Sequence, residues 1–112
     1  EDITEAMYRE LFEEVGLSKK DIDVLGESKG TITYDIPLTL RSMVLGGKFK
    51  GQDQKWFLAR IKNDDFKINL ENEAFPEFEE YEWVSYWRPL DRIIDFKKEA
   101  YRLALTELRY ML

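Results

Sequence analysis

The chain has 112 residues, of which 44% are hydrophobic and 36% charged, and its formal net charge at pH 7 is −6. This length and balance indicate one globular domain or most of one, and they exclude a disordered chain. Because the sequence has neither cysteine nor histidine, disulfides, imidazole bases and the usual zinc sites are excluded, and any metal must be held by oxygen. The negative charge argues against broad electrostatic binding to nucleic acid, and no apolar run is long enough to span a bilayer.

The first predicted element is a helix that runs to Val15. Its apolar residues recur at helical spacing and form an arc beside a row of carboxylates. Gly16 is expected to take the left-handed conformation that ends many helices, with Leu17 folding back onto the last turn. Ser18 then has the character of an N-cap and predicts a short turn over residues 18–21.

Strands are predicted over residues 22–25, 31–36, 55–61 and 81–86, the last with Trp83 at its centre. A turn is expected at 63–65, a short strand or a loop at 68–70, and an irregular connection at 38–51. Helices are predicted over 89–94 and 96–111, the second with Leu103 on its buried face. A helix, then strands, then helices indicate an α/β fold with a mixed or antiparallel sheet between helices. Trp83 and Trp87 are assigned to the core.

Three glutamates crowd one side of the first helix. Glu10, Glu13 and Glu14 are three and four residues apart, so they lie within an arc of about 100° and repel one another. A divalent cation turns this repulsion into ligation, because Mg²⁺ and Mn²⁺ prefer oxygen ligands. The alternative is an ordinary glutamate-rich helix with a solvated face.

The same residues belong to a longer pattern. After Glu1 and seven residues, the chain reads Arg9-Glu10-Leu11-Phe12-Glu13-Glu14-Val15-Gly16-Leu17. This resembles the second half of the Nudix box, the signature of a family of pyrophosphohydrolases, whose first glycine would precede Glu1. Residues 1–112 are therefore expected to be the C-terminal portion of a Nudix domain, starting inside the box and lacking several N-terminal strands. The resemblance implies an α/β/α sandwich with a mixed sheet.

Further segments resemble the bacterial RNA pyrophosphohydrolase branch of that family, which is also described as dinucleoside polyphosphate hydrolase. These segments are Gln52-Asp53-Gln54-Lys55-Trp56-Phe57, Pro76-Glu77-Phe78, Trp83-Val84-Ser85-Tyr86-Trp87 and Asp95-Phe96-Lys97. The resemblance implies a cytoplasmic hydrolase that uses Mg²⁺ or Mn²⁺ and removes pyrophosphate from the 5′-triphosphate end of RNA.

The resemblance also implies roles for single residues. Glu10, Glu13 and Glu14 match metal-binding glutamates, and Glu10 or Glu14 would act on the attacking water. Arg9 matches the arginine that pairs with these glutamates and orients them. Glu77 matches a further catalytic carboxylate that reaches the metal from outside the box, although an acidic loop such as this one is also typical of a solvated surface.

Three residues match positions on the substrate side of this branch, namely Tyr34, Phe96 and Lys97. Gln52 is a further, weaker candidate for substrate binding, since a glutamine in a loop is more often merely polar. Aromatic rings can stack on a nucleobase and a lysine can contact phosphate or a base edge. Equally, Tyr34 and Phe96 fit the periodicity of core residues. The stretch from Glu27 to Ile36 has a single cation, which favours a nucleotide over a long RNA path on that surface.

Two alternatives to RNA pyrophosphohydrolase activity stay open at this point. One is hydrolysis of dinucleoside polyphosphates such as diadenosine tetraphosphate or pentaphosphate, and the other is a truncated, non-catalytic binding domain. The expected partner is thus 5′-triphosphorylated RNA or a dinucleoside polyphosphate. Neither a membrane nor DNA is expected as a partner, and a monomer is favoured.

Overall fold

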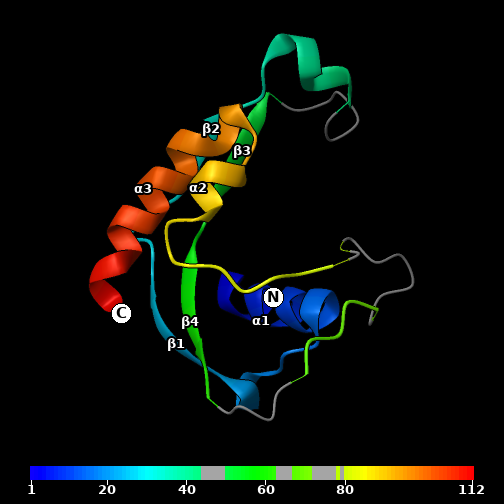
Figure 1. The fold of residues 1–112 in the computed structure, drawn as a ribbon, viewed down its shortest axis with the longest axis vertical. Coiled ribbons are helices and arrows are strands. Elements are labelled where there is room, and N and C mark those ends of the chain that lie inside the picture. Colours follow the sequence, from blue (N-terminus) through cyan, green and yellow to red (C-terminus); the bar gives the residue numbers. More distant parts are fainter. Residues whose placement is uncertain (44–49, 63–66, 72–77, 79) are drawn as a thin grey trace. The chain divides into compact units, whose positions relative to one another are not determined.

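The computed structural model of this chain describes residues 1–43, 50–62, 67–71, 78 and 80–112. Its helices and small antiparallel sheets confirm the predicted α/β class (Figure 1). The helices and strands are α1 (Ile3–Val15), β1 (Ile22–Glu27), β2 (Ile32–Asp35), β3 (Gly51–Gln54), β4 (Phe57–Ile61), α2 (Pro89–Arg92) and α3 (Lys98–Leu108). The chain divides into two compact units, residues 1–25 with 59–83 and residues 26–58 with 84–112.

Helix α1 of the first unit begins and ends where local chemistry favours it. The side chain of Asp2 accepts a hydrogen bond of 2.8 Å from the backbone N–H of Glu5, which satisfies one of the free donors of the first turn. At the other end, Gly16 takes the left-handed conformation with φ of 81°, and its N–H donates to the carbonyl of Phe12 at 2.9 Å. The predicted end at Val15 is therefore confirmed.

Replacing Gly16 with alanine is expected to lower the free energy of unfolding by about 1–2 kcal/mol, because a Cβ is strained at positive φ. Gly16→Asn is the matched control, since asparagine tolerates this conformation better than alanine. Urea denaturation of the three proteins measures the difference. Equal midpoints for the alanine and asparagine variants would show that backbone strain is not the cause.

A capping box joins α1 to the strands. The carboxylate of Asp21 accepts hydrogen bonds from the backbone N–H and the hydroxyl of Ser18, at 2.8 and 2.9 Å. These bonds, the backbone one first, lower the pKa of Asp21. Strand β1 follows immediately and pairs with β4, and it is longer by two residues than the strand predicted at 22–25. Buried Leu17 and Ile22 flank the turn.

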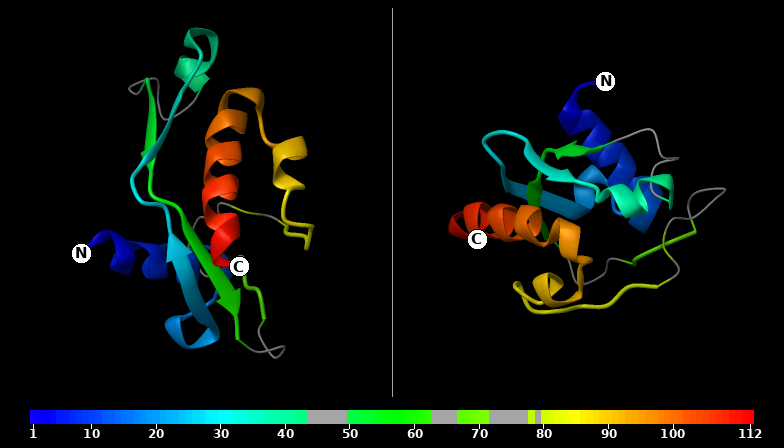
Figure 2. Two further views of the ribbon diagram at one scale, coloured as in Figure 1. Left: turned by 90° about the vertical axis from the view of Figure 1, so that its left-hand side faces the viewer. Right: turned by 90° about the horizontal axis from the view of Figure 1, so that it is seen from above.

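The second unit contains an antiparallel pair of strands covered by α3 (Figure 2). In the register of β2 and β3, Ile32 lies opposite Gln54 and Tyr34 opposite Gln52. Strand β3 is missing from the predicted elements, because residues 51–54 are polar and include glycine, which gives no strand signal. The predicted alternation of β2 is confirmed, since Ile32, Tyr34 and Ile36 are all buried.

The core of this unit forms where β2 meets α3. Ile32, Tyr34 and Ile36 pack with Ala100 and Ala104, small residues that let the helix approach the strands closely. Partly buried side chains close the edges of this cluster: Leu40, Trp56 and Phe96. Two of the predicted substrate-side residues thus contribute to a packed core, Tyr34 inside it and Phe96 at its edge.

Buried Ser28 holds Trp56, which follows strand β3, through hydrogen bonds. Its N–H donates to the carbonyl of Trp56 at 2.8 Å, and the N–H of Trp56 donates back to the Ser28 hydroxyl at 3.1 Å. The hydroxyl in turn donates to the carbonyl of Gly30 at 2.7 Å, so the buried polar atoms of Ser28 are satisfied. Trp56, fixed in this way, packs edge-on against Tyr101 with ring centres 4.8 Å apart.

Three predictions about the C-terminal part are wrong. Residues 81–86 are not a strand, and Trp83 and Trp87 are 66% and 40% exposed. Aromatic residues favour a strand only where a neighbouring strand completes the ladder, so their pattern alone was misleading. Leu103 lies on the exposed side of α3, where Ala100, Ala104 and Leu108 form the buried face.

The helix predicted over 96–111 is interrupted at both ends. A 3₁₀ turn (Asp95–Lys97) precedes α3, and another (Arg109–Met111) follows it. The brief helix predicted at 89–94 is confirmed as α2. The turn predicted at 63–65 lies outside the described residues.

In the part of the chain that the structure describes, no helix has both the length and the apolar character that crossing a membrane requires.

Candidate active site

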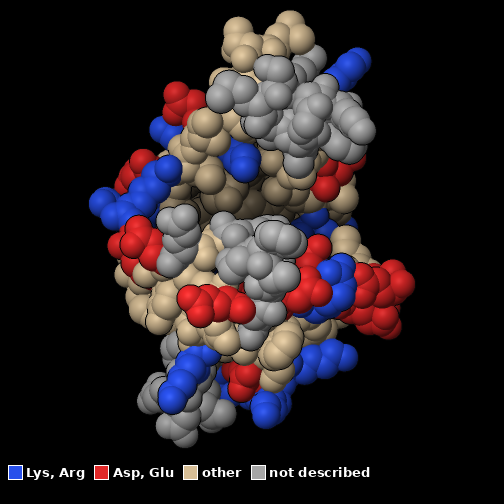
Figure 3. All heavy atoms as spheres, turned by 90° about the vertical axis from the view of Figure 1, so that its right-hand side faces the viewer, with Lys and Arg blue, Asp and Glu red and all other residues tan. Residues whose placement is uncertain are grey.

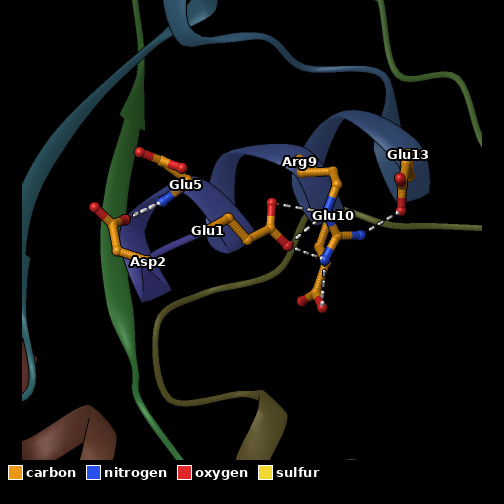
Figure 4. Close-up of polar contacts among 6 residues, drawn as sticks. All are labelled: Glu1, Asp2, Glu5, Arg9, Glu10 and Glu13. Carbon is orange, nitrogen blue, oxygen red and sulfur yellow. Dashed lines mark hydrogen bonds and ion pairs between the residues drawn. The ribbon is translucent and has the colours of Figure 1, made fainter.

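The glutamates that the sequence singles out lie on the C-terminal half of α1, in the first unit. The helix carries Glu10, Glu13 and Glu14 at spacings that place them along one side. The guanidinium of Arg9 lies among the carboxylates (Figure 4). Its atoms Nε and Nη2 donate to Glu1 at 2.9 and 2.7 Å, and Nη1 donates to Glu13 at 3.1 Å. Glu10 lies 3.9 Å away from Nη2.

This network fixes positions more than it adds stability. The side chain of Arg9 is 46% exposed, and exposed ion pairs of this kind contribute little to the free energy of folding. The guanidinium donors nevertheless hold two carboxylates in defined places, and they bind Glu1 more closely than Glu13. The hydrogen bond from Arg9 lowers the pKa of Glu1, and the same contacts raise the pKa of Arg9.

Glu1 is the residue that sequence reasoning missed as part of the site. The motif contains a glutamate eight positions before the arginine, yet the prediction gave it no role. In the structure Glu1 is the principal partner of Arg9, through two hydrogen bonds to its Oε1 and a third from Nε to its Oε2 at 3.2 Å. The fixed spacing of Glu1 and Arg9 within the motif was the signal that could have identified this pair, since about two turns of helix separate them.

The chemistry of the donors on this face fits a hard divalent cation. All three glutamates offer carboxylate oxygens, and the side chains of Glu10 and Glu13 are 59% and 41% exposed to solvent. Among the described residues no three acidic side chains already converge into a complete ligand set. Glu77, the carboxylate predicted to join the set, lies outside those residues. The face therefore provides ligands of the right type but not a closed cage.

The four predicted substrate-side residues come together within the second unit. Tyr34 on β2 donates a hydrogen bond of 2.6 Å from its hydroxyl to Oε1 of Gln52, its partner on β3. The ring of Phe96 lies 5.7 Å from that of Tyr34, centre to centre. The ammonium of Lys97 is 5.5 Å from the centre of the Tyr34 ring and 5.9 Å from that of Phe96. Residues separated by up to 63 positions thus form one cluster, hereafter the aromatic cluster.

Within the aromatic cluster, Tyr34 differs from the other three residues. It is only 6% exposed, so its ring packs in the core, as one of the two sequence interpretations held. Burial, with a smaller contribution from nearby Tyr101, raises the pKa of the Tyr34 hydroxyl, which stays protonated and can donate. Gln52, Phe96 and Lys97 are partly buried, so each keeps some surface that a ligand could contact.

Charges of both signs are interspersed outside these clusters. On the face that Figure 3 shows, acidic side chains gather in groups with basic side chains beside them. Among the described residues, several exposed cations form ion pairs with acids, such as Lys62 with Asp23 at 3.5 Å and Lys98 with Asp95 at 3.3 Å. Where described cations are paired with acids in this way, a polyanionic ligand meets isolated positive charges and not a continuous basic surface.

Comparison with known proteins places these residues in a family. The NUDIX domain matches residues 1–104. RNA pyrophosphohydrolases from Aliivibrio fischeri (strain MJ11) and Vibrio cholerae are each 44% identical over 103 residues, which cover 92% of this chain and 61% and 60% of the two relatives. The RNA pyrophosphohydrolase from Escherichia coli O139:H28 is 41% identical over 107 residues, 96% of this chain and 61% of that protein. The chain spans about three fifths of the length of these relatives and belongs to the NUDIX domain family.

Proposed function

We propose that the protein is a metal-dependent hydrolase that removes pyrophosphate from the 5′-triphosphate end of RNA. The observation that carries this proposal is the set of glutamates on α1, with Arg9 bonded to Glu13 at 3.1 Å and to Glu1 at 2.7 Å. The names and the sequence identity of the relatives support the choice of RNA as substrate. In this proposal residues 1–112 act as parts of one catalytic domain.

Nudix hydrolases generally need divalent metal ions. In the proposal, Glu10, Glu13, Glu14 and Glu77 hold Mg²⁺ or Mn²⁺. A bound ion of this kind neutralises phosphate oxygens and lowers the pKa of a coordinated water.

The chain's own residues then have distinct tasks. Arg9 keeps Glu13 and Glu1 in place, and Glu10 or Glu14 accepts a proton from the attacking water. The water oxygen bonds to phosphorus in line with the departing group, and the P–O bond of the anhydride breaks. Pyrophosphate leaves, and the RNA keeps a 5′-monophosphate.

The aromatic cluster is proposed to hold the nucleotide portion of the substrate. Phe96 offers a ring face for stacking, which contributes about 1–3 kcal/mol per base in comparable sites. Lys97 offers a cation for a phosphate or an acceptor on a base edge. Gln52 offers its amino group, because the carbonyl oxygen of its amide already accepts from Tyr34.

A competition experiment tests the substrate. The protein would be given 5′-triphosphorylated RNA and diadenosine tetraphosphate, separately and together, with Mg²⁺ or Mn²⁺, and kcat/KM measured for each. We expect the RNA to have the higher kcat/KM and to yield pyrophosphate and 5′-monophosphorylated RNA. A higher value for the dinucleotide would reassign the enzyme to that substrate, which the single cation between Glu27 and Ile36 would then explain.

A further inference from the structure

A polar side chain occupies a position where the core would accept an apolar one. Gln54 lies opposite Ile32 in the register of β2 and β3, on the sheet face that Tyr34 also shares. The other residues of this face that pack in the core are apolar or aromatic, namely Ile32, Tyr34, Ile36 and Trp56. A glutamine in such a row lowers stability unless both ends of its amide find partners.

Only one end of the Gln54 amide has a partner among the described residues. Its amino group donates to Oε1 of Gln52 at 3.4 Å, whereas its own Oε1 is buried without a hydrogen-bond partner there. With the Gln52 amide oriented as it is by Tyr34, turning the Gln54 amide over would not help, because its oxygen would then face the oxygen of Gln52. The orientation of Gln54 is therefore fixed by Gln52, and a buried acceptor is left unsatisfied as a result.

The same bond fixes Gln52. Its Oε1 accepts from the hydroxyl of Tyr34 at 2.6 Å and from the amino group of Gln54 at 3.4 Å, which uses both lone pairs of that oxygen. The amide plane of Gln52 is thus held from two sides. Its amino group, which donates and cannot accept, is the end that a ligand can use.

We propose that Gln54 is a positioning residue, which acts through Gln52 to present a hydrogen-bond donor to the bound substrate. The kinetic test of this inference rests on the proposed function. The mobility of the Gln52 side-chain amide, in contrast, can be measured without substrate. The unpaired oxygen of Gln54 lowers the stability of the protein. In exchange, the hydrogen bond from Gln54 fixes the orientation of Gln52.

Gln54→Met is the decisive variant, because methionine has nearly the same length and shape but neither donates nor leaves a strong acceptor unpaired. We expect KM for 5′-triphosphorylated RNA to rise about 3–10-fold with kcat nearly unchanged, the effect of one neutral hydrogen bond. The unfolding midpoint should stay equal or rise. A merely structural glutamine would instead show a lower midpoint and an unchanged KM.

Gln54→Glu and Asp53→Asn complete the set. The glutamate variant keeps the length of the side chain but cannot donate to Gln52 when ionised, so it should raise KM at least as much as methionine. Asp53 lies next to Gln54 on the opposite face of β3, where it accepts from the Thr33 hydroxyl at 2.5 Å. Asp53→Asn keeps an acceptor there, and KM should not change.

A double-mutant cycle tests whether Gln54 acts through Gln52. If it does, Gln54→Met should add nothing to the KM of Gln52→Met, so the two effects are not additive. Additive effects, or an unchanged KM in Gln54→Met, would overturn the inference.

Nuclear magnetic resonance of the side-chain amide separates this inference from the proposed function. The heteronuclear NOE of the Gln52 amino group should fall in Gln54→Met relative to the unsubstituted protein, with no substrate present. An unchanged NOE refutes the positioning role, whatever the enzyme hydrolyses. If the NOE falls but the unsubstituted protein does not hydrolyse RNA, the proposed function is wrong and the positioning of Gln52 stands.

Discussion

Replacing Glu14 with glutamine is expected to lower kcat for pyrophosphate release by on the order of 10²–10⁴-fold, the range for loss of a group that takes up a proton. Glutamine keeps the size of the side chain but removes the negative charge and the basic oxygen. The variant should also need a higher concentration of Mg²⁺ or Mn²⁺ for half-maximal rate, because one charged ligand is lost. Steady-state kinetics over a range of metal concentrations measure both effects.

Glu5→Gln provides the matched control for this variant. Glu5 is exposed in the first turn of the same helix, and its replacement removes the same charge. Its rate should stay close to that of the unsubstituted protein, and both variants should unfold at similar urea concentrations. If Glu14→Gln retains full kcat and full metal affinity, Glu14 has no part in the mechanism, and the proton would have to pass to Glu10.

The first helix and its carboxylates could be predicted because their signals are local. Gly16 ends α1 through its own backbone conformation, and the spacing of Glu10, Glu13 and Glu14 follows from 3.6 residues per turn. No distant part of the chain is needed for either inference. The carboxylate face was therefore recognisable from about fifteen residues of sequence.

The aromatic cluster could not be assembled from periodicity. Tyr34, Gln52 and Phe96 come together because β2 pairs with β3 and a 3₁₀ turn precedes α3. The strand pairing depends on contacts between distant residues, and β3 has a sequence of low strand propensity. Tyr34, Phe96 and Lys97 could be named from the resemblance to the RNA pyrophosphohydrolases, and Gln52 was a weaker candidate. The hydrogen bond from Tyr34 to Gln52 became visible only in the structure.

The prediction of a strand at 81–86 was wrong for the opposite reason, because its local signal was strong. Its aromatic and β-branched residues have the composition of a strand, and Trp83 at the centre strengthened that interpretation. The structure leaves Tyr81 and Trp83 more than half exposed, with their rings packed edge-on at 6.3 Å. Local propensity was strong, but a strand also requires a partner edge, which composition does not report.

Gly51→Ala is expected to destabilise the pair of strands on which the aromatic cluster is built. A Cβ at Gly51 would overlap the backbone oxygen of Tyr34 and lie 3.0 Å from the Cα of Asp35. Because these are backbone atoms of the paired strand, they cannot rotate away as the end of a long side chain could. The free energy of unfolding should fall by about 1–3 kcal/mol, the usual cost of overpacking.

The same substitution should weaken substrate binding, because relief of the overlap separates β2 from β3 next to the bond between Tyr34 and Gln52. Gly30→Ala is the matched control, since no atom lies within 4 Å of a Cβ built there and the residue has no positive φ. Chemical denaturation and KM for triphosphorylated RNA should both change in Gly51→Ala, and neither should worsen in Gly30→Ala. A stable Gly51→Ala protein with an unchanged KM would mean that close approach of these strands is not what holds Gln52 in place.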